Sequence, residues 1–218
     1  MILIPAEKSN IAWFKLAEFV MRKEKERALG VYRLLEHSFH NEAFAKQLEA
    51  DLLAAFHDEK ACEKYQKTAH LYEQKEQYIQ ALIMYEKTLT FSLQLAIISK
   101  IIHLANKIHL MNKLFHYAKL FITSACQQGL FQQASELSMN LTLTPPEKTV
   151  LHETCITTAL EAHCTDVTLL SYHVTQVSSD YIKNKQFEKL HALLQHFEQK
   201  YPFLYAACQN NQSMQAFL

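Results

Sequence analysis

The sequence predicts an all-α protein of about twelve antiparallel helices, and three observations favour this class. Two glycines and four prolines in 218 residues are too few for the tight turns that sheets and phosphate-binding loops require. Apolar residues recur at the spacing i, i+3, i+4 and i+7 along nearly the whole chain. The links between these stripes are short, about two to four residues, so each helix must turn back along the previous one.

Local signals mark several helix boundaries. Asn41, Asp58 and Asp166 can act as N-caps, and Pro202 can open the last helix because its missing N–H costs nothing there. The apolar fraction of 49% is enough to bury a sizeable core. The expected helices cover 10–23, 26–39, 41–57, 60–74, 78–92, 95–109, 112–128, 131–141, 147–163, 167–183, 187–200 and 203–217.

The segment Thr144-Pro145-Pro146-Glu147 predicts a capping box. Thr144 is the expected N-cap, Pro145 takes the first helical position, and Glu147 reaches back to the cap. No Ser- or Gly-rich linker divides the chain, so we expect one continuous domain over 1–218, with 203–217 as a possible C-terminal capping helix.

Small and aromatic residues alternate over residues 67–89. Ala69 and Tyr72 lie on the first helix of a hairpin, and Tyr78, Ala81 and Tyr85 lie on the second. Small alanines allow two helix backbones to approach closely, while tyrosines fill the space beside them. This pattern predicts a tightly packed helical hairpin.

These residues, together with Thr88, make residues 62–93 resemble the tetratricopeptide repeat (TPR). The resemblance implies a right-handed α-α superhelix, a TPR-like solenoid with roughly 35 residues per hairpin. Fainter copies of the motif lie within 13–35, 129–146 and 187–202, while Thr68 and Glu76 depart from the motif in the best repeat. A compact helical bundle is the alternative architecture, because aromatic and alanine stripes also occur in ordinary cores.

A second spacing is also present. Ala28, Ala81 and Ala134 lie 53 residues apart, which corresponds to about three helices rather than two. The spacing is either accidental or the sign of a drifted repeat, and the sequence leaves both open.

The charge balance excludes a strong overall attraction to nucleic acid or to an acidic membrane, since 22 basic residues offset 22 acidic ones. Residues 87–135 nevertheless contain no Asp or Glu, so this stretch is either a solvated basic surface or an anion-binding patch. The five cysteines lack CxxC spacing, which favours packed thiols in a reducing compartment. No signal peptide or spanning helix is evident, so we expect a cytoplasmic protein.

The sequence contains few signs of catalytic or metal-binding chemistry. His37 with His40, and His152 with Cys155, have i, i+3 spacing, but neither pair has a further ligand nearby, so we expect no metal site. No motif indicates a catalytic nucleophile or a phosphate loop, so we expect no catalytic residues, no cofactor and no enzyme activity. Only three arginines occur, which argues against nucleic-acid binding.

Resemblance to the TPR family implies a non-catalytic scaffold or adaptor that binds a peptide or helix of a partner protein in a concave groove. The groove residues implied by the best repeat and by the next clear repeat half are Glu63, Gln66, His70, Glu73, His116, Lys119 and Thr123. Glu63 and Glu73 with Lys119 would favour a partner that carries both signs of charge. Gln66 and His70 stand where chaperone-tail binders carry Asn and a basic residue, so we do not expect that ligand.

Two other functions remain open. The chain could be a chaperone or structural subunit of a larger assembly that uses a convex or terminal apolar surface, such as Phe203, Ala206, Asn210, Met214 and Phe217. Alternatively, the stripe of Lys100, His103 and Lys107 could touch anionic lipid, although membrane contact is the less favoured reading. The sequence does not define the oligomeric state.

Overall fold

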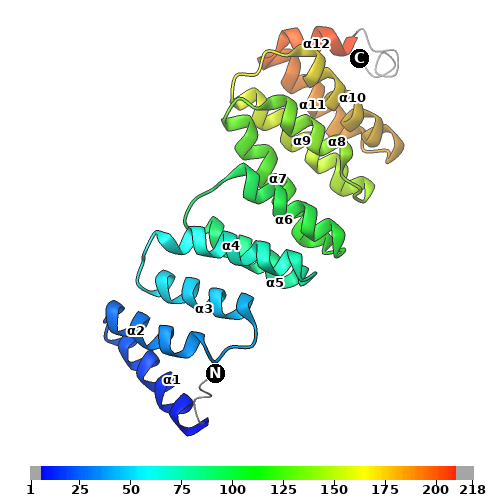
Figure 1. Ribbon diagram of the computed structural model, residues 1–218. Helices are drawn as coiled ribbons and strands as arrows, with labels where there is room; N and C mark the ends of the chain where they lie inside the picture. Colours follow the sequence, from blue (N-terminus) through cyan, green and yellow to red (C-terminus); the bar gives the residue numbers. More distant parts are fainter. Residues whose placement is uncertain (1–5, 210–218) are drawn as a thin grey trace. The chain divides into compact units, whose positions relative to one another are not determined.

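The computed structural model describes residues 6–209, and within this range the chain forms twelve α-helices and no β-strand (Figure 1). The predicted all-α class is therefore confirmed. The chain divides between His109 and Leu110 into two compact units, here called unit 1 and unit 2. The helices are α1 (Ala6–Met21), α2 (Lys25–Glu36), α3 (Glu42–Ala55), α4 (Lys60–Gln74), α5 (Tyr78–Leu89), α6 (Leu95–Lys107), α7 (Met111–Gln127), α8 (Phe131–Asn140), α9 (Pro145–Glu161), α10 (Val167–Lys183), α11 (Phe187–Lys200) and α12 (Pro202–Gln209).

Unit 1 contains α1 to α6, and most of its helices pack on the next one along the chain: α1 on α2, α3 on α4, α4 on α5 and α5 on α6. In unit 2, α9 packs on α7, α8 and α10. The helix expected over 203–217 begins at Pro202 as α12, while Asn210, Met214 and Phe217 lie outside the described residues. A continuous domain over 1–218 stays a prediction. None of the described helices is long and apolar enough to cross a membrane.

Asn41 and Asp166 are N-caps as predicted, whereas the N-cap position of α4 is taken by Glu59 and Asp58 makes its bond from one residue earlier. The Asn41 side chain accepts hydrogen bonds from the backbone N–H of Ala43 and Phe44, at 3.1 and 3.5 Å. Asp166 accepts one from the N–H of Leu169 at 3.0 Å. Asp58 accepts from the N–H of Lys60 at 2.9 Å, at the start of α4. Each of these bonds satisfies an amide that has no partner within its helix.

The start of α9 also agrees with its sequence signal. The Glu147 carboxylate accepts hydrogen bonds from the backbone N–H of Thr144 at 3.1 Å and from its hydroxyl at 2.6 Å. Pro145 is the first helical residue. Glu147 therefore reaches back to the cap as expected.

Replacement of Asn41 by alanine is expected to lower the free energy of unfolding of unit 1 by about 1 kcal/mol, the usual cost of a lost N-cap. The same carboxamide oxygen also accepts from Lys75 at 3.2 Å, so the change removes a link between α3 and the end of α4. Urea titration followed by circular dichroism measures the difference. Gln80→Ala, at an exposed position within α5, is the matched control and should leave the transition in place. Equal stability of both variants would contradict the capping role of Asn41.

One type of turn recurs along the chain and reveals the structural repeat. It joins α1 to α2, α4 to α5, α7 to α8 and α10 to α11, and one residue in each turn has a left-handed φ between 56° and 74°. The following residue donates its N–H to the carbonyl five residues earlier, as Gln77 does to Tyr72 at 2.9 Å, which is the Schellman arrangement. The left-handed residues, 53, 53 and 56 positions apart, are Lys23, Glu76, Gly129 and Lys185.

The 53-residue spacing of the alanines has the same origin. Ala28, Ala81 and Ala134 are each the fourth residue of the helix that follows this turn, and each is fully buried. A second left-handed turn precedes α4, α7 and α10, with a histidine each time: His57, His109 and His163. The turns of this chain thus repeat every three helices, so the spacing seen in the sequence is structural.

The hairpin α4–α5 is packed as its sequence predicts. Ala69 and Ala81 have no exposed surface, and Tyr72 and Tyr85 are at most 4% exposed. Thr68, an unusual residue for a core position, is fully buried, and its hydroxyl is satisfied by donating to the carbonyl of Lys64 at 2.8 Å. Small and aromatic residues therefore interlock between the two helices.

Candidate functional site

The four groove residues expected in the best repeat lie on one side of α4. Glu63, Gln66, His70 and Glu73 follow each other at helical spacing, and we call this row the α4 strip. The side chains of Glu63 and His70 are 67% and 61% exposed, whereas Glu73 is only 20% exposed. The strip is therefore open to solvent at Glu63 and His70 and partly buried at Glu73.

A hollow of about 500 Å³, the α3–α4 hollow, opens on one side of the α4 strip. Two predicted groove residues, Gln66 and His70, contribute to its wall. The three other ionisable residues in its wall are all lysines. The lining residues are Lys46, Lys64, Gln66, Lys67, His70, Leu71 and Gln74.

A second hollow of about 490 Å³, the α4–α6 hollow, is lined by residues of α4, α5 and α6. The predicted residue Glu73 lies in its wall. The basic stripe of α6 that the sequence suggested as an anion or lipid site lines it as well. The lining residues are Glu73, Tyr78, Ser99, Lys100, His103, Leu104 and Lys107.

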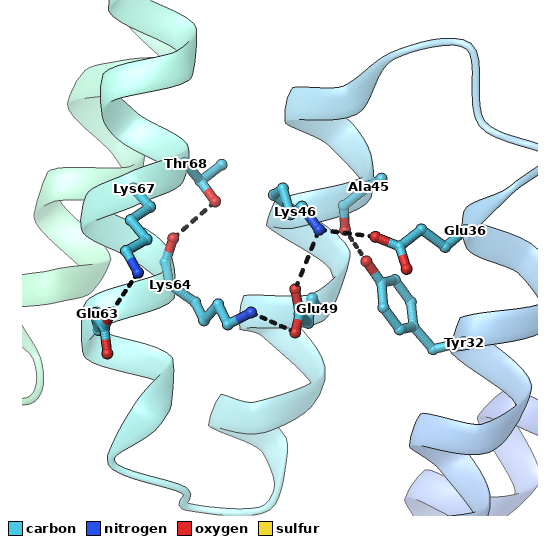
Figure 2. A network of polar contacts seen from close by, with 9 residues as sticks. All are labelled: Tyr32, Glu36, Ala45, Lys46, Glu49, Glu63, Lys64, Lys67 and Thr68. Carbon is cyan, nitrogen blue, oxygen red and sulfur yellow. Dashed lines mark hydrogen bonds and ion pairs between the residues drawn. The ribbon is translucent and has the colours of Figure 1, made fainter.

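The wall of the α3–α4 hollow is held by a charged network (Figure 2). Lys46 donates to Glu36 of α2 at 2.8 Å, and Lys64 donates to Glu49 of α3 at 2.6 Å. The hydrogen bond from Lys46 lowers the pKa of the Glu36 carboxyl, and the same bond raises the pKa of Lys46. Both groups are therefore charged at neutral pH, and the network ties α2, α3 and α4 together.

Tyrosines order the lysines of the α4–α6 hollow. The ammonium of Lys107 donates to the Tyr78 hydroxyl at 2.8 Å and lies 4.0 Å from the centroid of its ring. Lys100 lies 3.9 Å from Glu73, and its ammonium is 5.9 Å from the Tyr85 ring centroid. Burial, and then the charge of Glu73, raise the pKa of Tyr85, so its hydroxyl stays protonated at neutral pH.

Both acidic groups of the α4 strip already have partners within unit 1. Glu63 pairs with Lys67 at 2.5 Å, and this hydrogen bond lowers the pKa of the Glu63 carboxyl. Glu73 faces His70 at 3.6 Å and Lys100 at 3.9 Å. The strip therefore offers a partner less negative charge than the sequence suggested, because the lysines that compensate Glu63 and Glu73 lie beside them in the fold.

The three groove residues predicted in unit 2 share one side of α7. His116 and Lys119 are exposed, and Thr123 is half-buried. His116 contacts the ring of Tyr117 edge-on at 5.0 Å, and the Lys119 ammonium lies 5.9 Å from the Phe115 ring centroid. Counted back from the recurring turn, these residues occupy the places of Glu63, Gln66 and His70 in α4.

Comparisons with known proteins assign no family to this chain. No protein-family model matches it, and no curated protein matches it. Among solved structures, the chain resembles that of BtubC (BKLC) from P. vanneervenii with a TM-score of 0.35 and 16% identity, over 94% of this chain and 83% of that one.

Unit 2 also contains a buried polar cluster that the sequence did not reveal. Nδ1 of His152 on α9 lies 2.8 Å from Nδ1 of His173 on α10. Nε2 of His173 lies 2.8 Å from the Ser135 hydroxyl and 3.4 Å from the Cys155 thiol. Burial, and then the neighbouring His152, lower the pKa of His173 to about 3. Both rings are thus neutral members of a hydrogen-bonded core.

Two of the residues considered as metal ligands, His152 and Cys155, belong to this buried cluster. His152 and Cys155 do share a neighbour from another helix, but that neighbour is His173 and the group is closed by hydrogen bonds. No group of three or more His, Cys, Asp or Glu side chains within the described residues could hold a metal ion. Cys126, Cys155 and Cys164 are buried free thiols, and Cys62 is half-buried.

Proposed function

We propose that this chain is a non-catalytic scaffold or adaptor that binds a peptide or helix of a partner protein along the α4 strip, and that it is TPR-like in this use of its helices. One observation carries the proposal. Gln66 and His70 border the α3–α4 hollow, and Glu73 borders the α4–α6 hollow. An exposed helix with a hollow at each side can accommodate both the backbone and the side chains of a bound segment.

The order of the surrounding side chains supports the same proposal. Lys64 is held by Glu49, Lys67 by Glu63 and Lys107 by Tyr78. Binding loses less conformational entropy when the contacting side chains are already ordered. Charges at the border of such a groove mainly set the orientation and the association rate of the partner.

Site-specific crosslinking in the native cell tests this function. A photoreactive amino acid placed at Gln66 or at His70 should yield the same covalent adduct, identified by mass spectrometry. The matched control is the same amino acid at Gln80, which is exposed on the neighbouring helix α5 and borders neither hollow. Adducts that are absent at both strip positions, or identical at Gln80, would contradict binding along α4.

A second function, subunit of a larger assembly, is favoured by a separate observation. The side chains of Phe14 and Met21 on α1 are 78% and 85% exposed, and Ile11 on the same side of the helix is 57% exposed. Large apolar side chains gathered on one helix face often mark a protein interface. In the same crosslinking experiment, adducts at Phe14 but not at Gln66 would favour this function over the first.

A further inference from the structure

The charges of the α4–α6 hollow do not balance. Lys100 and Lys107 bring two ammonium groups, and the wall holds one carboxylate, that of Glu73. Glu73 is already shared by His70 at 3.6 Å and Lys100 at 3.9 Å. Within residues 6–209, no carboxylate lies within 4.0 Å of the Lys107 ammonium, which is bound instead by the Tyr78 hydroxyl and ring.

This arrangement keeps the Lys107 ammonium in a position where it can bind an anion. A ring face and a hydroxyl oxygen fix the position of the Lys107 ammonium but leave its charge uncompensated. His103 is exposed between the two lysines and can donate a further hydrogen bond. A carboxylate that enters the hollow would therefore meet ordered donors rather than flexible surface side chains.

We propose, on the basis of the function proposed above, that the segment bound by this chain is acidic and that its Asp or Glu side chains enter the α4–α6 hollow. Lys107 is the principal anchor, and Lys100 is the secondary one because Glu73 partly compensates it. The hollow has more positive than negative charge, so an acidic segment is complementary to it.

The spacing of the two lysines defines the pattern expected in the partner. Lys100 and Lys107 are two turns apart on α6, which corresponds to roughly 10 Å along the helix. A peptide in the extended polyproline II conformation has three residues per turn and rises about 3.1 Å per residue, so side chains three residues apart lie on the same side and roughly 9 Å apart. An acidic pair with two residues between its members thus matches the hollow.

A protein segment fits this site better than an anionic membrane does. The basic groups line a hollow of about 490 Å³ that also contains Glu73. A membrane surface is flat and would leave the interior of such a hollow unfilled. An extended peptide can insert single side chains.

Binding of synthetic peptides to the full chain tests the inference. The probe is a fluorescent ten-residue peptide with Glu-Ser-Ser-Glu at its centre, and the reference peptide has Gln-Ser-Ser-Gln. Fluorescence anisotropy should show at least about tenfold weaker binding of the reference peptide, and binding of the acidic peptide should weaken as salt rises from 50 to 300 mM. Equal binding of both peptides would overturn the inference.

Single substitutions test whether the acidic peptide binds in the α4–α6 hollow. Lys107→Gln should weaken binding of the acidic peptide by roughly fivefold, since one charge pair is lost. Glu73→Gln should strengthen it, because a competing carboxylate is removed. Lys15→Gln, which removes an exposed lysine on α1, is the matched control and should have no effect. If Lys107→Gln and Lys15→Gln behave alike, the hollow is not the site.

Failure of this inference can be told apart from failure of the proposed function. Crosslinks at Gln66 and His70 that persist while the acidic peptide does not bind would leave a scaffold whose partner is not acidic. In a parallel experiment, binding of the chain to vesicles containing 30% phosphatidylserine is measured. Binding to such vesicles that is lost in Lys107→Gln, without peptide binding, would overturn the choice of occupant.

Discussion

Unit 2 is expected to lose about 2 kcal/mol of stability when the pH falls from 7.5 to 5.0. His173 is fully buried, and its pKa in the folded chain is about 3, whereas an unfolded chain takes up this proton near pH 6.5. Below pH 6.5 the unfolded state therefore binds more protons than the folded state. Stability is present in full above pH 6.5 and is lost as the pH falls toward 3. Burial lowers the pKa of His152 as well, so it acts in the same direction.

The groups around this pair make the effect specific to unit 2. His173 faces His152 and Cys155 of α9 and Ser135 of α8, and none of these offers a negative charge at pH 5. The charges of Lys148 and Asp180 influence the pKa of His152 in opposite directions, since Lys148 lowers it and Asp180 raises it. No group in the cluster therefore offsets the positive charge that protonation of His173 would introduce.

Two probes separate the units in a urea titration. Labelling of Cys155, read peptide by peptide by mass spectrometry, reports on unit 2, because this thiol is buried beside His173. Fluorescence of Trp13, which packs against Phe39 at 5.9 Å between ring centroids, reports on unit 1. The Cys155 transition should move to lower urea at pH 5.0, and the Trp13 transition should move less. No buried histidine is found among the described residues of unit 1.

Two variants provide controls. His173→Gln should be less stable at pH 7.5 but should lose less further stability at pH 5.0, because the titrating group is gone. His116→Gln, at an exposed position of unit 2, should keep the full pH dependence. An identical pH dependence in wild type and His173→Gln would show that other groups cause the loss.

Replacement of Ala81 by leucine is expected to lower the free energy of unfolding of unit 1 by about 1–3 kcal/mol, the usual cost of overpacking. Ala81 has no exposed surface, and the neighbouring Tyr85 is 3% exposed. Three additional carbon atoms can be accepted only if α4 and α5 separate or the tyrosines leave their rotamers. Urea titration followed by Trp13 fluorescence and circular dichroism measures the loss.

Gln80→Leu is the matched control for this variant. It introduces the same side chain at the preceding, exposed position of α5, so it tests leucine without steric conflict. Its transition should stay close to that of the wild type. An Ala81→Leu protein as stable as Gln80→Leu would contradict close packing of the α4–α5 hairpin.

The candidate site was only partly predictable. The motif at Ala69 and Tyr72 placed Gln66, His70 and Glu73 on the outer side of α4, and the structure finds them beside two hollows. Lys46 of α3 and Lys64 of α4 were missed, because a lysine on a polar helix face carries no signal of its own. Tyr78 was recognised as a packing residue of the motif, but not as the partner of Lys107. Lys100, His103 and Lys107 were visible as a stripe on α6, but their association with Glu73 and Tyr78 depends on how α6 lies against α4 and α5.

Periodicity and capping chemistry are local, so the sequence alone determined the twelve helices and starts such as those at Asn41, Thr144 and Asp166. Only the tertiary structure decided which side chains meet. The histidine pair joins residues 21 positions apart, and Lys107 reaches Tyr78 across 29 positions. It also decided that the turns repeat every three helices, because a left-handed residue such as Lys23 or Lys185 has no obligatory amino acid. Contacts of this kind arise from helix packing, which one stretch of sequence does not encode by itself.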